Sequence, residues 1–128
     1  MLFRSGLGFA LDLKKPGGFL GKDAVLARKA AGPLRQRLVQ VQVLDPEPLL
    51  FHAEVVWCNG QRVGYVRSGS YGFTLGGAVG LAMVAAEVAI DQAWLDAQTW
   101  EVEIAGRRWP ARCSLRPLVD PDGAKIRA

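Results

Sequence analysis

The sequence has 128 residues, of which 50% are hydrophobic and 22% charged, which is the composition of one globular domain and excludes a disordered chain. Its longest uncharged apolar run, from Leu75 to Ala86, is short and broken by glycines, so it predicts no membrane-spanning segment. Two cysteines are too few for a disulfide scaffold, and the start Met1-Leu2-Phe3-Arg4 lacks the layout of a signal peptide. These features together predict a cytoplasmic protein.

The charge balance is mildly basic, with 16 Lys and Arg residues against 12 Asp and Glu residues and a formal net charge of +4. A nucleic-acid-binding protein usually clusters its cations with aromatic residues between them. Here the cations are spread along the chain in short groups such as Lys14-Lys15 and Arg107-Arg108. The pattern therefore favours a solvated surface, and an acidic ligand or partner is the alternative.

The amino-terminal third predicts one strand and one short helix. Residues 7–13 alternate between apolar and small or polar side chains, which is typical of a half-buried strand. Residues 22–31 are good helix formers, and Ala24, Val25 and Arg28 share one face of the expected helix. Gly32-Pro33 ends it, because glycine adopts the left-handed cap conformation and proline cannot continue a helix.

The remainder predicts short strands joined by tight turns. Val39, Val41 and Val43 form the inner face of an alternating segment, and Asn59-Gly60 is a strong hairpin signal because both residues tolerate a positive φ. A second hairpin is expected to turn at Ala105-Gly106, and Pro110 in its second strand is expected at a sheet edge or bulge. The predicted strands cover residues 37–43, 54–58, 62–67, 79–84, 99–104 and 108–115.

Residues 85–98 are expected to form a loop with one helical turn that partly buries Val88, Trp94 and Leu95. With the strand at residues 7–13 there are seven predicted strands. The predicted fold class is therefore mainly β, a small antiparallel β-barrel of about six or seven strands with one short helix near the N-terminus.

Few residues form a recognisable chemical site. His52 has no cysteine or carboxylate at metal-ligand spacing, so no metal site is predicted. Cys58 and Cys113 are expected to be buried free thiols, since no histidine partner is evident for either. No catalytic set of side chains is found, and the four tryptophans are expected in packing roles.

The glycine-rich stretch from Ser68 to Gly77 admits two interpretations. It matches no known phosphate-binding loop, and a tight, close-packed crossover between strands explains the glycines well. The alternative is a surface that faces a ligand or partner, because backbone N–H groups in such a stretch can hold an anion. In that case Arg67 and Tyr71 would make the contacts.

Two stretches of the chain resemble a known family. Gly6 to Leu13, followed by Phe19 to Leu26, resembles the end of the folate-binding region of glycine cleavage T-proteins, the aminomethyltransferases. Val63 to Leu75 is similar to the signature of that family's C-terminal barrel, and its Ser-Gly-Ser-Tyr-Gly core is closer to the variant in dimethylglycine and sarcosine dehydrogenases. The ending from Pro117 to Gly123 fits those enzymes too.

The resemblance implies a division into residues 1–33, the tail end of the folate-binding region with a strand and a short helix, and residues 34–128, the C-terminal β-barrel. It implies an accessory domain, inactive alone, of a tetrahydrofolate-dependent one-carbon transferase or a methylamine-type dehydrogenase. Phe9, at the family's aromatic position, Arg67 and Tyr71 are the candidate cofactor-binding residues near the folate cleft. Tetrahydrofolate is expected in the longer enzyme and is not expected to bind this fragment tightly.

The expected partner is the upstream folate-binding domain, and a homo-oligomer could form through the inter-domain face that its absence exposes. That face is expected to be an apolar patch around Phe9 and Trp109. A stand-alone small-barrel module that binds RNA or protein is the alternative function, and an intact small enzyme is a weaker one because no catalytic set was found.

Overall fold

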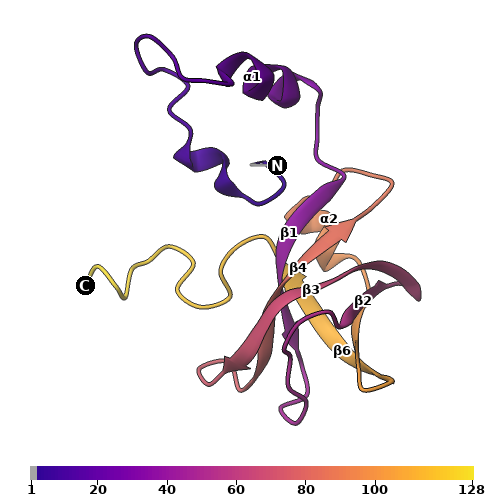
Figure 1. Ribbon diagram of the computed structural model, residues 1–128. Coiled ribbons are helices and arrows are strands. Elements are labelled where there is room, and N and C mark those ends of the chain that lie inside the picture. Colours follow the sequence, from indigo (N-terminus) through magenta and orange to yellow (C-terminus); the bar gives the residue numbers. More distant parts are fainter. Residues whose placement is uncertain (1–2) are drawn as a thin grey trace.

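Six antiparallel strands of the computed structural model close into a barrel, and two helical segments precede it (Figure 1). The structure describes residues 3–128, so Met1-Leu2, part of the start that lacks a signal-peptide layout, lies outside the described residues. The strands follow one another around the barrel in the order β1-β4-β3-β2-β5-β6. Their bounds are β1 Gln36–Val43, β2 Val55–Cys58, β3 Gln61–Gly72, β4 Gly77–Ala85, β5 Trp100–Ile104 and β6 Arg107–Ser114.

The barrel interior is filled by β-branched side chains that alternate with outward-facing residues. Val39, Val41 and Val43 on β1 are almost inaccessible to solvent, as the alternation predicts. Matching inward residues come from four more strands: Val56, Val66, Ala82, Val84 and Val102. The predicted mainly β barrel with a short helix near the N-terminus is therefore confirmed, with six strands.

The amino-terminal segment, residues 3–33, is called the arm here, and it stands away from the barrel in Figure 1. The predicted strand at residues 7–13 is wrong. The structure has a 3-10 helix, η1 (Leu7–Ala10), followed by turns, and η1 buries none of its residues. A strand needs a neighbour for its backbone N–H and C=O groups, and within residues 3–128 no strand lies beside the alternating segment.

The predicted helix is confirmed as α1 (Lys22–Ala30). Gly32 has φ +93°, which is the left-handed conformation expected after a helix end. However, α1 buries none of its residues, so tertiary packing within this chain contributes little to its stability. The arm is hydrogen-bonded to the barrel through Arg4, whose carbonyl oxygen accepts from the N–H of Leu38 at 2.6 Å.

Both predicted hairpin turns are present. Asn59 and Gly60 have φ values of 49° and 77°, and Ala105 and Gly106 have 51° and 77°. Two consecutive left-handed residues match the twist of antiparallel strands. The Asn59 amide also joins two elements, because its Oδ1 accepts from the N–H of Thr99 at 2.9 Å and its Nδ2 donates to Oε1 of Gln98 at 2.7 Å.

Replacing Asn59 with alanine is expected to reduce the free energy of unfolding by about 1–2 kcal/mol, because the left-handed backbone becomes strained and two hydrogen bonds are lost. Urea denaturation followed by tryptophan fluorescence would measure the change. The neighbouring exposed residue offers a control, since Gln61→Ala should stay within about 0.5 kcal/mol. Equal effects of the two substitutions would contradict the assigned role of Asn59.

The prediction of a sheet edge or bulge at Pro110 is wrong, because β6 is paired with both β5 and β1 in the closed barrel and neither ladder has a register shift. Pro110 is paired with Glu101 of β5, whereas the pairing of β6 with β1 begins only at Ala111. The Pro110 carbonyl oxygen accepts from the N–H of Leu44, which is already beyond the end of β1. The ladder on this side therefore needs no N–H from residue 110, so proline is tolerated there.

One end of the barrel is closed by a short helix, α2 (Gln92–Asp96), within the segment where one helical turn was predicted. Asp91 caps α2, since its Oδ1 accepts from the N–H of Trp94 at 2.7 Å. Leu95 is 1% exposed and packs into the core, whereas Val88, which was expected to be partly buried, is 51% exposed.

Candidate functional site

The glycine-rich stretch forms the far end of β3, a turn and the start of β4 (Figure 1). A Cβ atom at Gly69 would lie 2.6 Å from the backbone carbonyl of Leu50, and one at Gly77 would lie 2.7 Å from the carbonyl oxygen of Val43. These contacts are shorter than any side chain tolerates. Close packing thus accounts for these two glycines without a ligand, as in the crossover interpretation.

Arg67 and Tyr71 both lie on β3. Arg67 is exposed at a register shift between Val66 and Ser68, and its guanidinium carbon lies 4.2 Å from the ring centroid of Tyr65. Such a shift leaves one residue without a partner on the neighbouring strand and re-aims its side chain. The Tyr71 ring is half-buried and meets the Phe73 ring edge-on, with centroids 5.2 Å apart. One strand therefore carries both side chains, the Arg67 side chain exposed and the Tyr71 ring half-buried.

Phe9 lies in η1, and its side chain is 87% exposed. Within residues 3–128, no hydrogen bond or ring contact joins Phe9 to Arg67 or Tyr71. The three candidate residues are thus distributed between the arm and the barrel, and their cofactor-binding roles stay predictions.

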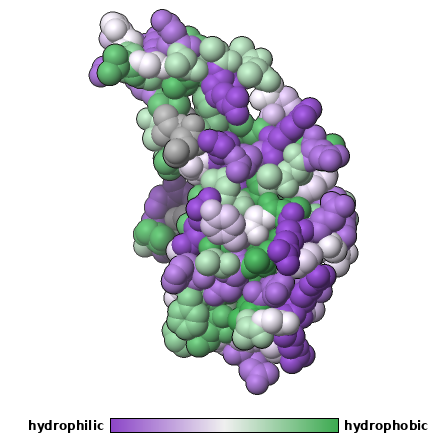
Figure 2. Space-filling model, turned by 45° about the vertical axis from the view of Figure 1, so that its right-hand side comes forward, coloured by the Kyte–Doolittle hydropathy of each residue, from purple (hydrophilic) through white to green (hydrophobic). Residues whose placement is uncertain are grey.

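The expected apolar patch around Phe9 and Trp109 is found only in part. Besides Phe9, the arm exposes Leu7, Leu20 and Leu26, and apolar residues appear beside charged ones on its surface (Figure 2). Trp109, in contrast, is half-buried on β6, with the guanidinium carbon of Arg107 at 3.9 Å from its ring centroid. The exposed apolar surface near Phe9 thus belongs to the arm, and the barrel exposes apolar side chains of its own, among them Phe51 and Phe73.

Trp57 is covered by arginines on the outer face of the barrel. The guanidinium carbons of Arg62 and Arg108 lie 5.1 and 3.5 Å from its ring centroid, and its Nε1–H donates to Oε2 of Glu103 at 2.9 Å. Trp57 is 8% exposed. A nucleic-acid base stacks on an accessible ring face, so this arrangement of cations and tryptophan does not favour RNA binding.

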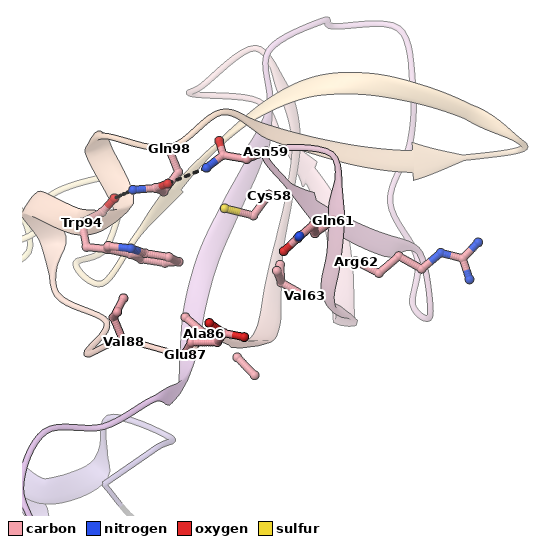
Figure 3. Close-up of a pocket in the computed structure, with 11 residues that line it drawn as sticks. Cys58, Asn59, Gln61, Arg62, Val63, Ala86, Glu87, Val88, Trp94 and Gln98 are labelled. Atoms are coloured by element: carbon pink, nitrogen blue, oxygen red, sulfur yellow. Dashed lines mark hydrogen bonds between the residues drawn. The ribbon is translucent and has the colours of Figure 1, made fainter.

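A cavity of about 450 Å³ opens at the end of the barrel that α2 closes, and sequence reasoning did not find it (Figure 3). Its wall includes Cys58, Trp94 and Gln98, and Gln98 is fixed by donating from Nε2 to the carbonyl oxygen of Trp94 at 3.0 Å. The Arg62 side chain extends away from the cavity towards Trp57. One rim of the cavity is the turn at Asn59-Gly60, which the sequence does predict. The opposite wall depends on how residues 85–98 fold back.

Both thiols are buried and free, as predicted. Burial raises the pKa of Cys58 above its ordinary value near 9.0. Burial also raises the pKa of Cys113, and negative charge on Cys58 would raise it further. Neutral thiols are poor nucleophiles, so neither cysteine is prepared for covalent catalysis.

Iodoacetamide at pH 8 is expected to modify Cys58, which lines the cavity, faster than Cys113, and both more slowly than in the urea-unfolded chain. Because both thiols ionise more easily when unfolded, their contribution to stability is complete below pH 9 and decreases as the pH rises above it. Mass spectrometry of the labelled peptides measures the order. Equal labelling rates in the native chain would contradict the easier access assigned to Cys58.

His52 is exposed in the loop before β2. In the part of the chain that the structure describes, no group of three or more His, Cys, Asp or Glu side chains is placed to hold a metal ion. None of the described helices has the length and apolar character needed to cross a bilayer.

Comparisons with known proteins agree on the barrel. A family model described as "Glycine cleavage T-protein C-terminal barrel domain" matches residues 36–120. A 4-methylaminobutanoate oxidase (formaldehyde-forming) from Paenarthrobacter nicotinovorans is 43% identical over 125 residues, which is 98% of this chain and 14% of the oxidase. Human mitochondrial sarcosine dehydrogenase is 32% identical over 127 residues, which is 96% of this chain and 13% of that enzyme.

Among solved structures, the crystal structure of glycine cleavage system aminomethyltransferase T from Bartonella henselae has a similar fold, with a TM-score of 0.72 and 21% sequence identity. The match covers 94% of this chain and 32% of that one. This chain therefore spans about one seventh of the oxidase and about one third of the aminomethyltransferase.

Proposed function

Since this chain belongs to the family of glycine cleavage T-protein C-terminal barrel domains, we propose that it is the accessory barrel of a longer tetrahydrofolate-dependent enzyme. That enzyme would be a one-carbon transferase or a methylamine-type dehydrogenase, and the barrel alone would not catalyse the reaction. The oxidase and the sarcosine dehydrogenase match across 98% and 96% of the chain, including the arm, whereas the family model begins only at residue 36. We accordingly assign residues 1–33 to the preceding folate-binding domain and residues 34–128 to the barrel.

The exposed arm carries this proposal. Neither η1 nor α1 buries a residue, yet both expose leucine or phenylalanine side chains: Leu7, Phe9 and Leu26. Apolar helix faces without a partner gain free energy when another domain covers them. The upstream domain is the partner that we propose, and in the isolated chain a second copy would use the same face. The cytoplasm is the proposed location.

Tetrahydrofolate fits the candidate residues in part. The exposed Phe9 ring suits an aromatic group, and the exposed Arg67 guanidinium suits the carboxylates of a glutamate tail. Phe9 lies in the arm and Arg67 lies in the barrel, so a complete folate pocket needs further residues from the upstream domain. When bound, tetrahydrofolate accepts the one-carbon unit of the amine substrate. Phe9, Arg67 and Tyr71 would orient it, and the barrel would exclude water from the cleft.

A domain exchange tests the proposal. We would replace the matching segment of the 4-methylaminobutanoate oxidase with residues 1–128 and measure oxidation of 4-methylaminobutanoate and formaldehyde release, with and without tetrahydrofolate. The chimera should keep its activity within about tenfold of the parent. A matched chimera with Leu7, Phe9 and Leu26 changed to serine should lose folding yield or activity. A stable chimera whose activity is unaffected by these changes would contradict docking through the arm.

Calorimetry of the isolated chain with tetrahydrofolate tests whether the folate pocket lies in this chain or in the upstream domain. Weak or no binding is expected, because the remainder of the pocket is assigned upstream. Tight binding by these 128 residues would show that the pocket lies within this chain and would overturn the accessory role.

A further inference from the structure

A groove of about 380 Å³ separates the last turn of α1 from the barrel. The arm contributes Pro33, and the barrel side contributes Leu34 at the approach to β1 and Ile90 from the segment before α2. These residues give the groove a largely apolar lining. Figure 1 shows the linker that runs from α1 to β1. The groove is thus a joint between the arm and the barrel.

Three cations line this groove: Arg28 and Lys29 from α1, and Arg37 from β1. The one acidic residue in the lining is Asp91, whose Oδ1 already accepts the capping N–H of Trp94. In residues 3–128, the ion pairs join Arg108 to Glu101 and Arg116 to Asp122, so no carboxylate pairs with Arg28, Lys29 or Arg37. The groove therefore has surplus positive charge.

Arg37 also has an unsatisfied donor. Its Nη1 donates to the carbonyl oxygen of Ile90 at 3.2 Å, whereas its Nε is buried and has no hydrogen-bond partner. A buried N–H of a charged group without an acceptor is unfavourable. The guanidinium is a planar fork that matches the two oxygens of a carboxylate, and a small rotation would present Nε–H to the groove.

We propose that this groove binds a small apolar carboxylate. The carboxylate pairs with the Arg37 fork and is supported by the charges of Arg28 and Lys29, while the hydrocarbon part packs against Leu34 and Ile90. An apolar lining beside a single planar fork suits such a ligand better than a fully hydrated anion such as phosphate. Because the ligand contacts both α1 and β1, it joins the arm to the barrel. This site is separate from the proposed folate function and does not depend on it.

Titration of the 128-residue chain with phenylacetate, followed by amide NMR, tests the proposal. Saturable shifts are expected at Leu34, Arg37 and Ile90. The neutral analogue phenylacetamide should bind at least about tenfold more weakly, because it cannot form charge-assisted hydrogen bonds with the fork. Inorganic phosphate should also bind at least about tenfold more weakly, since it has no apolar part. Equal binding by phenylacetamide or by phosphate, or no saturable shifts with phenylacetate, would overturn the proposal.

Substitutions assign the binding to the groove. Arg37→Met keeps an apolar stem and should weaken phenylacetate binding by about tenfold or more. If Arg37→Met does not fold, the exposed pair Arg28→Gln and Lys29→Gln provides the test and should weaken binding about threefold. Arg35→Gln is the matched control, because Arg35 is exposed and does not line the groove. An unchanged affinity in the first two variants, or an equal loss in the Arg35 variant, would contradict the site.

Discussion

Replacing Gly64 with alanine is expected to destabilise the barrel by about 3 kcal/mol or more, because overpacking against backbone cannot be relieved by a rotamer change. Gly64 lies on β3 between β2 and β4, where it is paired with Val56 and Val84. A Cβ atom there would lie 1.9 Å from the carbonyl oxygen of Met83. The substitution therefore forces β3 and β4 apart.

Small domains have a total stability of about 5–15 kcal/mol, so this loss is a large part of it. Thermal unfolding followed by circular dichroism should show a midpoint about 12–24 °C lower than that of the parent. Gly8→Ala is a suitable control, since Gly8 lies in the arm and an added Cβ would meet only the Phe3 side chain at 3.2 Å. A midpoint for Gly64→Ala within 2–3 °C of the control, a shift worth only about 0.5 kcal/mol, would contradict the close approach of the two strands.

Replacing Leu95 with alanine is expected to reduce the free energy of unfolding by about 2–5 kcal/mol, the usual range for a leucine removed from a packed core. Leu95 is 1% exposed although it belongs to the five-residue helix α2, which closes the end of the barrel. Its carbonyl oxygen also accepts from Nε1 of buried Trp100 at 2.8 Å. The side-chain cavity would therefore open next to the hydrogen bond that fixes α2 on the core.

Urea denaturation measures this loss, and iodoacetamide labelling of Cys58 provides a local measurement, because Cys58 and α2 line the same cavity. Labelling should become faster in Leu95→Ala, while Val88→Ala should change neither quantity, since Val88 is 51% exposed at the rim. If Leu95→Ala cost less than about 1 kcal/mol, α2 would not be an integral part of the core.

Most of the barrel could be predicted from the sequence because its signals are local. The alternation of Val39, Val41 and Val43 and the turns at Asn59-Gly60 and Ala105-Gly106 depend on neighbouring residues, and the structure has all three. The same reasoning gave a wrong prediction for the arm. Residues 7–13 alternate as a strand does, yet they form η1 and turns because no strand of the described chain lies beside them. An alternating pattern indicates which face of a strand could be buried, but it does not show that a neighbouring strand is there to pair with.

The candidate site was less predictable than the fold. Arg67 ends the strand predicted at residues 62–67, and Tyr71 lies in the glycine-rich stretch that follows, whereas the structure carries both on the 12-residue strand β3. The cavity beside Cys58 and the groove beside Arg37 were not found, because each is formed by segments far apart in sequence. Residues 85–91 contribute to both, and their course depends on how α2 packs into the barrel end.

The sequence by itself determined most of the barrel strands, the turns, the short helix and the family resemblance, since these follow from local backbone preferences and from motifs of consecutive residues. Only the tertiary structure decided that the barrel closes with six strands, that the arm buries nothing in either of its helical segments, and that Arg37 carries a buried N–H without an acceptor. Burial and hydrogen-bond partners depend on which distant segments meet. The residues next to each other in the chain do not determine which distant segments meet.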